Sequence, residues 1–240
     1  MTAPRLEIDL KKIEDNARVL VARLADRGIG VTGVTKASLG TPEIADALLR
    51  AGVSGLGDSR IENIEGMSRA GISAPMTLIR SPMLSQAARV VANAHVSFNT
   101  ELDVVSKLSS AASNARRTHG IVLMVELGDL REGIMPGDLE KTVRETLRFP
   151  NIVLKGIGAN LACRSGVCPD NKNMAELSAL ADSIDATFGL MLEIVSGGNS
   201  ASLNWALGGA RTGRINDLRL GEAFLLGREP LHRQPIDGLH

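Results

Sequence analysis

Apolar residues along the chain follow two alternating patterns. The first is helical, with intervals of three and four between apolar positions, namely Leu10, Ile13, Ala17, Leu20, Val21 and Leu24. Glycines at positions 28 and 30 end this pattern, and a β-branched run over residues 29–34 follows. Thr41-Pro42 then suits the start of another helix, because a capping residue followed by proline is a favoured helix N-terminus. The chain therefore opens as helix, strand, helix.

This alternation continues to the end of the chain. The candidate strands are residues 29–34, 53–57, 76–79, 95–98, 121–126, 153–157, 190–195 and 218–226. Helical patterns lie between them at 60–70, 84–92, 101–115, 139–147 and 174–188, and a shorter helical turn starts at Ser200. Short continuous apolar runs are typical of parallel strands that are covered on both faces. Eight strand–helix units favour closure into a TIM-like (β/α)₈ barrel over an open doubly wound sheet.

Composition agrees with one domain over residues 1–240, of which 228–240 forms a polar tail. The chain carries 27 basic and 27 acidic residues, so no net field attracts nucleic acid or an anionic membrane. No apolar run approaches the ~20 residues of a membrane span, and the charged N-terminus is unlike a signal peptide. We therefore expect a soluble, cytoplasmic protein. Two cysteines make no disulfide framework, and four scattered histidines offer no metal-ligand spacing.

Polar residues follow most of the candidate strands, where the active site of such a barrel is found. They are Lys36, 58–60, 80–81, Asn99, 128–131, Asn160, 196–200 and 219–221. Because the carboxyl ends of all eight strands meet at one face of a barrel, we expect these residues to cluster there.

Lys36 is the sharpest chemical signal. It comes directly after an apolar strand (VTGVTKAS), so its amine is held at the barrel mouth. An amine kept from water beside other cations is an effective Schiff-base nucleophile. The alternative is a lysine whose amine extends from the barrel rim into solvent.

A glycine-containing turn at 196–202 (SGGNSAS) is the second candidate site. Adjacent glycines let backbone amides approach a ligand, and Asn199 or Ser200 can cap the following helix. Barrels often bind phosphate in the loops after strands seven and eight, where this turn and Gly221-Glu222 fall. An ordinary turn with a capping serine is the alternative. A phosphate site opposite a Schiff-base lysine describes a pocket for pyridoxal phosphate (PLP).

Two arginines are the third signal. Arg219 lies within the apolar final strand, where a buried guanidinium needs a partner. It could belong to a structural ion pair, or it could donate to the nitrogen of a pyridine ring. Arg131 lies in a glycine-flanked loop and could bind a substrate carboxylate or the phenolic oxygen of the cofactor.

With these residues in hand, the chain resembles the N-terminal barrel of the alanine racemase family, and most closely its ornithine-racemase-like branch. The resemblance covers nearly the whole chain in order. Its motifs are LEIDLKKIEDNARVL, GVTKASLGTPEIADALL, GLGDSRIENI, LMVELGDLREGI, GIGANLACRSGV, EIVSGGNSASL and INDLRLGEAFLLGRE. As a set these motifs are highly specific. The resemblance implies a PLP-dependent amino-acid racemase in which Lys36 is the PLP lysine.

The resemblance also implies roles for the other candidates. It makes Arg219 the contact of the pyridine nitrogen and places Arg131 on the far side of the cofactor. Asn160 stands where alanine racemases have a histidine partner of the pyridine arginine. A guanidinium does not readily give up its proton, so the ring nitrogen stays unprotonated, which limits transamination. The resemblance also implies that Asn199, Ser200, Gly221 and Glu222 bind the phosphate.

Two departures from the family are expected to matter. The C-terminal β domain of full-length members is expected to be absent from this chain. In alanine racemases that domain supplies a tyrosine from the neighbouring subunit of a homodimer as the second acid/base, and this chain contains no tyrosine. The second acid/base therefore has no assignment; Cys163 could substitute, or it could be a free buried thiol without function.

Three hypotheses stay open at this point. The first is a PLP-dependent racemase of a basic amino acid such as ornithine, whose distal ammonium could meet Asp58, Asp129 or Glu132 unless these are ordinary solvated charges. The second is a PLP-binding homeostasis protein without significant turnover. The third is a barrel with a Schiff-base lysine but no PLP, such as an aldolase.

Overall fold

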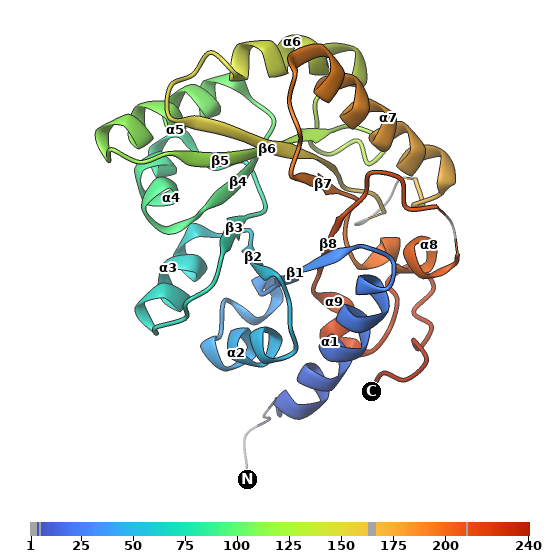
Figure 1. Ribbon diagram of the computed structural model, residues 1–240. Coiled ribbons are helices and arrows are strands. Elements are labelled where there is room, and N and C mark those ends of the chain that lie inside the picture. The colour runs from blue at the N-terminus through green and yellow to red at the C-terminus, as the bar shows by residue number, and fades with distance from the viewer. Residues whose placement is uncertain (1–3, 5, 163–166, 210) are drawn as a thin grey trace.

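The computed structural model describes residues 4, 6–162, 167–209 and 211–240. Within these ranges the strands pair in parallel, in chain order, and β8 pairs back onto β1 to close a barrel. Figure 1 shows this ring of strands with helices around its outside. The (β/α)₈ prediction is confirmed. The strands are β1 (Gly30–Val34), β2 (Gly55–Asp58), β3 (Met76–Leu78), β4 (Val96–Asn99), β5 (His119–Val125), β6 (Ile152–Ala159), β7 (Ile194–Ser196) and β8 (Asp217–Leu220).

The helices follow the strands, apart from α1, which precedes β1. They are α1 (Leu10–Ala25), α2 (Pro42–Arg50), α3 (Ile61–Arg69), α4 (Ala87–Asn93), α5 (Leu102–Asn114), α6 (Pro136–Thr146), α7 (Asn171–Phe188), α8 (Leu203–Leu207) and α9 (Glu222–Leu226). Short 3₁₀ turns, η1 (Lys36–Ser38), η2 (Leu84–Gln86) and η3 (Ser200–Ser202), occupy three of the strand–helix connections. The predicted Thr41-Pro42 start of the second helix is confirmed, with Pro42 in its first turn.

Strand register decides which side chains enter the barrel. Successive residues of a strand point to opposite faces, and laterally paired residues of neighbouring strands share a face. Outward-facing side chains pack with the helices into one large apolar core. The inner faces hold a separate apolar cluster of Phe98, Val122 and Met124. Arg219 pairs laterally with Thr32 and lies over the Phe98 ring, which places it inside the barrel.

Helix α1 closes the outer layer beside the short helices that follow β7 and β8. Asp9 caps α1 by accepting from the amides of Lys11 and Lys12. The helix packs against α2 on one side and against α9 and α8 on the other (Figure 1). Buried Asn16 donates to the carbonyls of Phe224 and His240, each at 3.0 Å. The segment 228–240 is thus held against the barrel, and its Ile236 and Leu239 pack on the core.

Two strand predictions are wrong at their ends. The predicted strand 218–226 ends at Leu220, and Glu222–Leu226 is helix α9. A short apolar run does not distinguish a strand from a buried helix by periodicity, and Gly221 separates the two elements here. The predicted strand 190–195 is reduced to β7, because the residues before β7 bond to Asp185 and not to a neighbouring strand. The backbone carbonyl of Asp185 accepts from the Leu190 amide, and its side chain accepts from the Leu192 amide.

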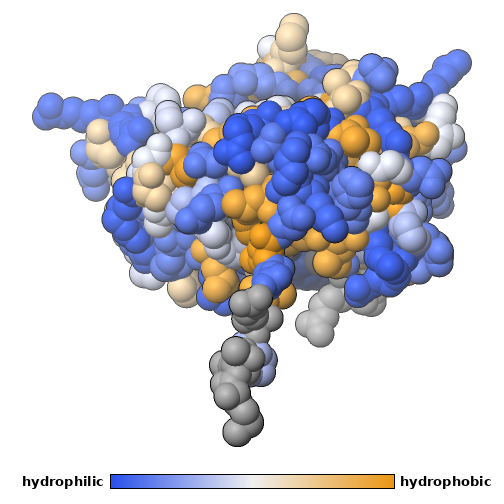
Figure 2. Space-filling model, turned by 90° about the horizontal axis from the view of Figure 1, so that it is seen from below, coloured by the Kyte–Doolittle hydropathy of each residue, from blue (hydrophilic) through white to orange (hydrophobic). Residues whose placement is uncertain are grey.

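One face of the molecule has a mixed polar and apolar surface. The face in Figure 2, which includes the N-terminal end, is mostly hydrophilic with apolar patches between polar side chains. Leu6 and Ile8, at the start of the described chain, are exposed. No described helix is both long and apolar enough to traverse a bilayer. The described residues also contain no group of three or more His, Cys, Asp or Glu side chains placed to share a metal ion.

Candidate active site

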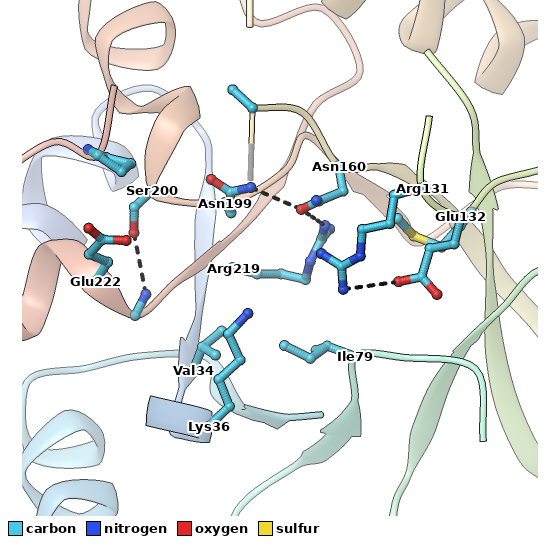
Figure 3. A pocket seen from close by; sticks show the side chains of 14 residues that line it. Val34, Lys36, Ile79, Arg131, Glu132, Asn160, Asn199, Ser200, Arg219 and Glu222 are labelled. Atoms are coloured by element: carbon cyan, nitrogen blue, oxygen red, sulfur yellow. Dashed lines mark hydrogen bonds and ion pairs between the residues drawn. The ribbon is translucent and has the colours of Figure 1, made fainter. Parts of the chain in front are cut away.

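A pocket opens at the carboxyl ends of the strands, within a space of about 730 Å³ that includes its open mouth. The residues assigned to the cofactor from the sequence all line it: Lys36, Arg131, Asn160, Asn199, Ser200, Arg219, Gly221 and Glu222. Figure 3 labels all of them except Gly221 and shows the labelled side chains reaching the pocket from several different strands and loops.

Lys36 reaches the pocket because of strand alternation. Val34 and Lys36 are two residues apart and both line the pocket, whereas Thr35 between them points outward. The Thr35 hydroxyl donates to the buried Asp58 carboxylate at 2.8 Å, which fixes the end of β1. Turn η1 begins at Lys36. The exposed side chain of Lys36 extends across the pocket toward Arg219 and Arg131 (Figure 3). The amine is therefore accessible and faces the pocket.

The two predicted phosphate elements meet in space. Turn η3 after β7 and the turn into α9 after β8 are joined by Ser200, whose Oγ accepts from the amides of Gly221 at 3.4 Å and Ala223 at 3.3 Å. Asn199 caps η3 by accepting from the Ala201 amide at 2.8 Å. Ser200 and Glu222 lie at one end of the pocket, with Lys36 nearer its middle (Figure 3). The Glu222 carboxylate is paired with Arg233 at 3.7 Å, so only its backbone is suited to an anion.

Arg219 lies at the bottom of the pocket and is 5% exposed. Its Nη1 donates to Ser196 Oγ at 2.5 Å, and its Nη2 donates to the Ala159 carbonyl at 2.9 Å and to Asn160 Oδ1 at 3.4 Å. Its guanidinium lies 4.8 Å from the centroid of the Phe98 ring. The guanidinium is thus held by neighbours on β4, β6 and β7 and presents its charge to the pocket.

Asn160 joins three parts of the site. Its Oδ1 accepts from Asn199 at 2.9 Å as well as from Arg219, as the dashed lines in Figure 3 show. Its Nδ2 donates to Asp129 at 3.1 Å in the loop after β5. The contact with Arg219 occurs at the position where the family resemblance expects a histidine partner.

Arg131 and Glu132 form the pocket wall away from Ser200 (Figure 3). Their side chains are 3.6 Å apart, and the Glu132 side chain is 28% exposed. The loop that carries them is shaped by Glu126, whose Oε1 accepts from the amides of Gly128 at 2.6 Å and Leu130 at 3.1 Å. Such bonds to a carboxylate are among the stronger ones in proteins.

Two residues expected at the site lie elsewhere. Asp58 is fully buried and accepts from Thr35, from Asn63 at 3.0 Å and from the Arg60 amide at 2.9 Å. Asn99 bonds to Ser97 on its own strand. Both point outward, because their neighbours Gly57 and Phe98 occupy the inner positions. Cys163 lies outside the described residues.

The structure adds residues that sequence reasoning did not assign. Ser196 and Asp217 lie beneath Arg219, with Ser196 donating to Asp217. Asp217 is two residues before Arg219 on β8, so strand alternation alone places both on the inner face. Pro230, in the expected polar tail, also lines the pocket. The position of Pro230 is set by the buried side chain of Glu229, which accepts from the amides of Leu231 at 2.7 Å and His232 at 2.9 Å. The amino-acid composition of this segment does not indicate such a turn.

The barrel, the strand-end lysine and the motifs around it define a family. The chain belongs to the alanine racemase family: the family model "Alanine racemase, N-terminal domain" matches residues 8–229. The resemblance found in the sequence is thereby confirmed. Two curated relatives are a lysine racemase from Thermotoga maritima, 38% identical over 239 residues, and an ornithine racemase from Acetoanaerobium sticklandii, 37% identical over 239 residues. These alignments cover 100% and 99% of this chain and 67% of each relative, so the chain spans about two thirds of their length.

Solved structures share the fold at lower identity. An alanine racemase from Clostridium difficile 630, in complex with cycloserine, matches with a TM-score of 0.83 at 20% identity, over 100% of this chain and 66% of that one. A D-threonine aldolase from Filomicrobium marinum matches with a TM-score of 0.79 at 19% identity, over 93% of this chain and 62% of that one. At these identities the likeness concerns the fold, which carries more than one activity.

Proposed function

We propose that this chain is a PLP-dependent amino-acid racemase, or its barrel domain, that acts on a basic amino acid such as lysine or ornithine. The observation that carries the proposal is the placement of Lys36 in one pocket with the joined Ser200 and Gly221 turns and with Arg219. The family supports a racemase, and the relatives named for lysine and ornithine racemisation support a basic substrate.

The chemistry of the pocket fits PLP. Three cationic side chains, Lys36, Arg131 and Arg219, line the pocket. They complement the negative charge of the phosphate and the phenolic oxygen of PLP. We assign the phosphate to the Asn199–Ser200 and Gly221–Glu222 turns, the ring nitrogen to Arg219 and the aldehyde carbon to Lys36. When bound, PLP supplies an electron sink for the negative charge that develops at Cα as the α-proton leaves.

Each residue of the chain then has a defined task. The Lys36 amine, which lies nearer the middle of the pocket, removes or returns the α-proton on one face of Cα. Arg219 donates to the ring nitrogen and keeps its own proton, because a guanidinium is a very weak acid. Arg131 binds the substrate carboxylate or the phenolic oxygen.

The pocket also favours one residue for a distal ammonium. Of the three acids considered from the sequence, Asp58 is buried outside the pocket and Asp129 accepts from Asn160. Glu132 lines the pocket itself, and its carboxylate is partly exposed there. We therefore assign the side-chain ammonium of the substrate to Glu132.

Borohydride reduction of PLP-loaded protein followed by peptide mass spectrometry tests the cofactor site directly. We expect the mass of a reduced PLP adduct on Lys36, and Lys12→Ala, which removes an exposed lysine of α1, serves as the control. Incubation with lysine, ornithine or alanine in deuterated water then tests activity through inversion and α-deuterium uptake. An adduct on another lysine would overturn the cofactor assignment.

The same experiment separates the remaining alternatives. A PLP-binding homeostasis protein would carry the adduct on Lys36 yet invert none of the amino acids. A Schiff-base aldolase without PLP would carry no adduct. Deuterium uptake without inversion would mean that a proton acceptor acts on only one face of Cα.

A further inference from the structure

A polar column runs through the inside of the barrel beneath Arg219. Ser196, Asp217 and Thr32 occupy inner positions on three consecutive strands around the ring, β7, β8 and β1. Ser196 pairs laterally with Asp217, and Thr32 pairs with Arg219. Asp217 and Thr32 also line a second cavity at the opposite end of the barrel, together with Phe98. The column therefore connects the active-site pocket with the lower opening.

The hydrogen-bond directions in this column are fixed. Ser196 has one hydroxyl proton, which it donates to Asp217. Only lone pairs of Ser196 therefore face Arg219 Nη1, which donates to it at 2.5 Å. The second carboxylate oxygen of Asp217 accepts from the Thr32 hydroxyl at 2.8 Å. Asp217 thus determines the orientation of the group that receives the Arg219 proton.

Charge gives the column a second consequence. A guanidinium that is 5% exposed has lost most of its hydration, and a buried cation is costly without a compensating charge. Ser196 places the carboxylate one hydrogen bond from Arg219, on the side away from the pocket. The carboxylate thus pulls the guanidinium down against Ser196 and Ala159 and stabilises its charge in place.

We propose that Asp217 is a positioning residue that acts through Ser196 to hold Arg219 in the orientation required at the ring nitrogen of the cofactor. The consequence for the cofactor rests on the proposed function; the consequence for Arg219 does not. Without Asp217 the Ser196 hydroxyl is free to rotate, and Arg219 turns away from its position. The ring nitrogen then loses its guanidinium partner and takes a proton from water.

The test uses Asp217→Asn, which removes the charge and keeps the size, and Ser196→Ala, which removes the connecting hydroxyl. Glu193→Gln is the matched control, because Glu193 lines the same lower cavity but pairs with Lys155 at 2.7 Å. Three readouts are taken. They are the Arg219 position in crystals of each variant, the ¹⁵N shift of ring-labelled PLP in the loaded protein, and the dissociation constant of PLP from the reconstituted apo-protein.

We expect Asp217→Asn to displace the guanidinium, to move the ¹⁵N shift toward that of a protonated pyridine and to weaken PLP binding about tenfold, as for loss of one charge-assisted hydrogen bond. Ser196→Ala should do the same, and the double variant should be no worse than either single variant. Glu193→Gln should change none of these.

An unmoved Arg219 in crystals of Asp217→Asn overturns the proposal, whether or not the protein binds PLP. So does an equal effect of Glu193→Gln. If Asp217→Asn does not fold, Ser196→Ala decides by the same readouts. If wild-type protein takes up no PLP on Lys36, the proposed function fails while the crystal comparison still tests the hold on Arg219.

Discussion

The side-chain amide of Asn199 donates to the amide oxygen of Asn160 over 2.9 Å, and the same oxygen accepts from Arg219 at 3.4 Å. A single side chain at the end of β6 therefore connects the turn assigned to the phosphate with the arginine assigned to the ring nitrogen. Asn199 and Arg219 are 39 and 59 positions from Asn160 in the sequence, and the lateral order of β6, β7 and β8 in the sheet brings all three together.

Replacing Asn160 should disturb both ends of the cofactor site at once. In Asn160→Ala, Asn199 and Arg219 each lose an acceptor, so we expect PLP to dissociate about tenfold more readily, as for loss of one or two hydrogen bonds. Fluorescence titration of apo-protein with PLP measures this. Asn93→Ala, which removes an exposed amide bonded to the Arg89 carbonyl, should leave the affinity unchanged. Equal affinities for all three proteins would contradict the role given to Asn160.

Lys36→Ala should remove the Schiff base and spare the fold. The absorbance band near ~420 nm that is typical of PLP bound to a lysine amine should be lost. Because Lys36 is exposed, the free energy of unfolding should change by no more than about 0.5 kcal/mol. Absorbance spectra and urea denaturation measure the two effects. A band that persists in the variant would place the cofactor on a different residue.

Substitution of Glu132 should change substrate preference, whereas substitution of Asp58 should change stability. Glu132→Gln should raise KM for ornithine or lysine about five- to tenfold while KM for alanine stays constant, because only the basic substrates lose an ion pair. Asp58→Asn should instead lower the free energy of unfolding by about 1–3 kcal/mol through its buried donors, with no change in substrate preference. Steady-state kinetics with three amino acids, together with denaturation curves, provide the comparison. A shift in preference caused by Asp58→Asn would refute this division of roles.

Acid should destabilise the protein through His119. The pKa of His119 is lowered to about 4, chiefly by burial and also by the nearby charges of His95 and Arg117, while a bond to the Ala94 backbone acts in the opposite direction. The unfolded chain takes up this proton near the ordinary pKa of 6.5. The stabilising contribution is thus fully present above about pH 6.5 and is lost as pH falls toward 4, by at most about 3 kcal/mol.

Denaturation curves between pH 4 and 8 measure this loss. The variant His119→Asn should flatten the pH dependence over that range, since its side chain does not titrate. His232→Asn is the control, because the His232 side chain is 71% exposed. An identical slope in wild type and His119→Asn would assign the acid sensitivity to other groups.

Much of the fold follows from local patterns in the chain. Short apolar runs between helical stripes are enough to locate each strand, because a strand that is covered on both faces is apolar along most of its length. The errors lie where such a run is ambiguous. Residues 222–226 are as apolar as a strand, but they form a helix after Gly221. Residues 190–193 form no strand, because amides in this segment donate to the side chain and the carbonyl of Asp185.

The sequence by itself determined the family, the barrel and the strand ends from which the pocket residues come, because motifs and strand ends are properties of neighbouring positions. Only the tertiary structure decided which strand-end residues face the pocket. Lys36 enters it and Asp58 does not, because the lateral pairing of Val34 with Gly57 sets which positions are inward. The column of Thr32, Asp217 and Ser196 beneath Arg219 likewise exists only where β7, β8 and β1 meet. Thr32 and Asp217, 185 positions apart in the chain, become hydrogen-bond partners there, since barrel closure joins the two ends of the sheet.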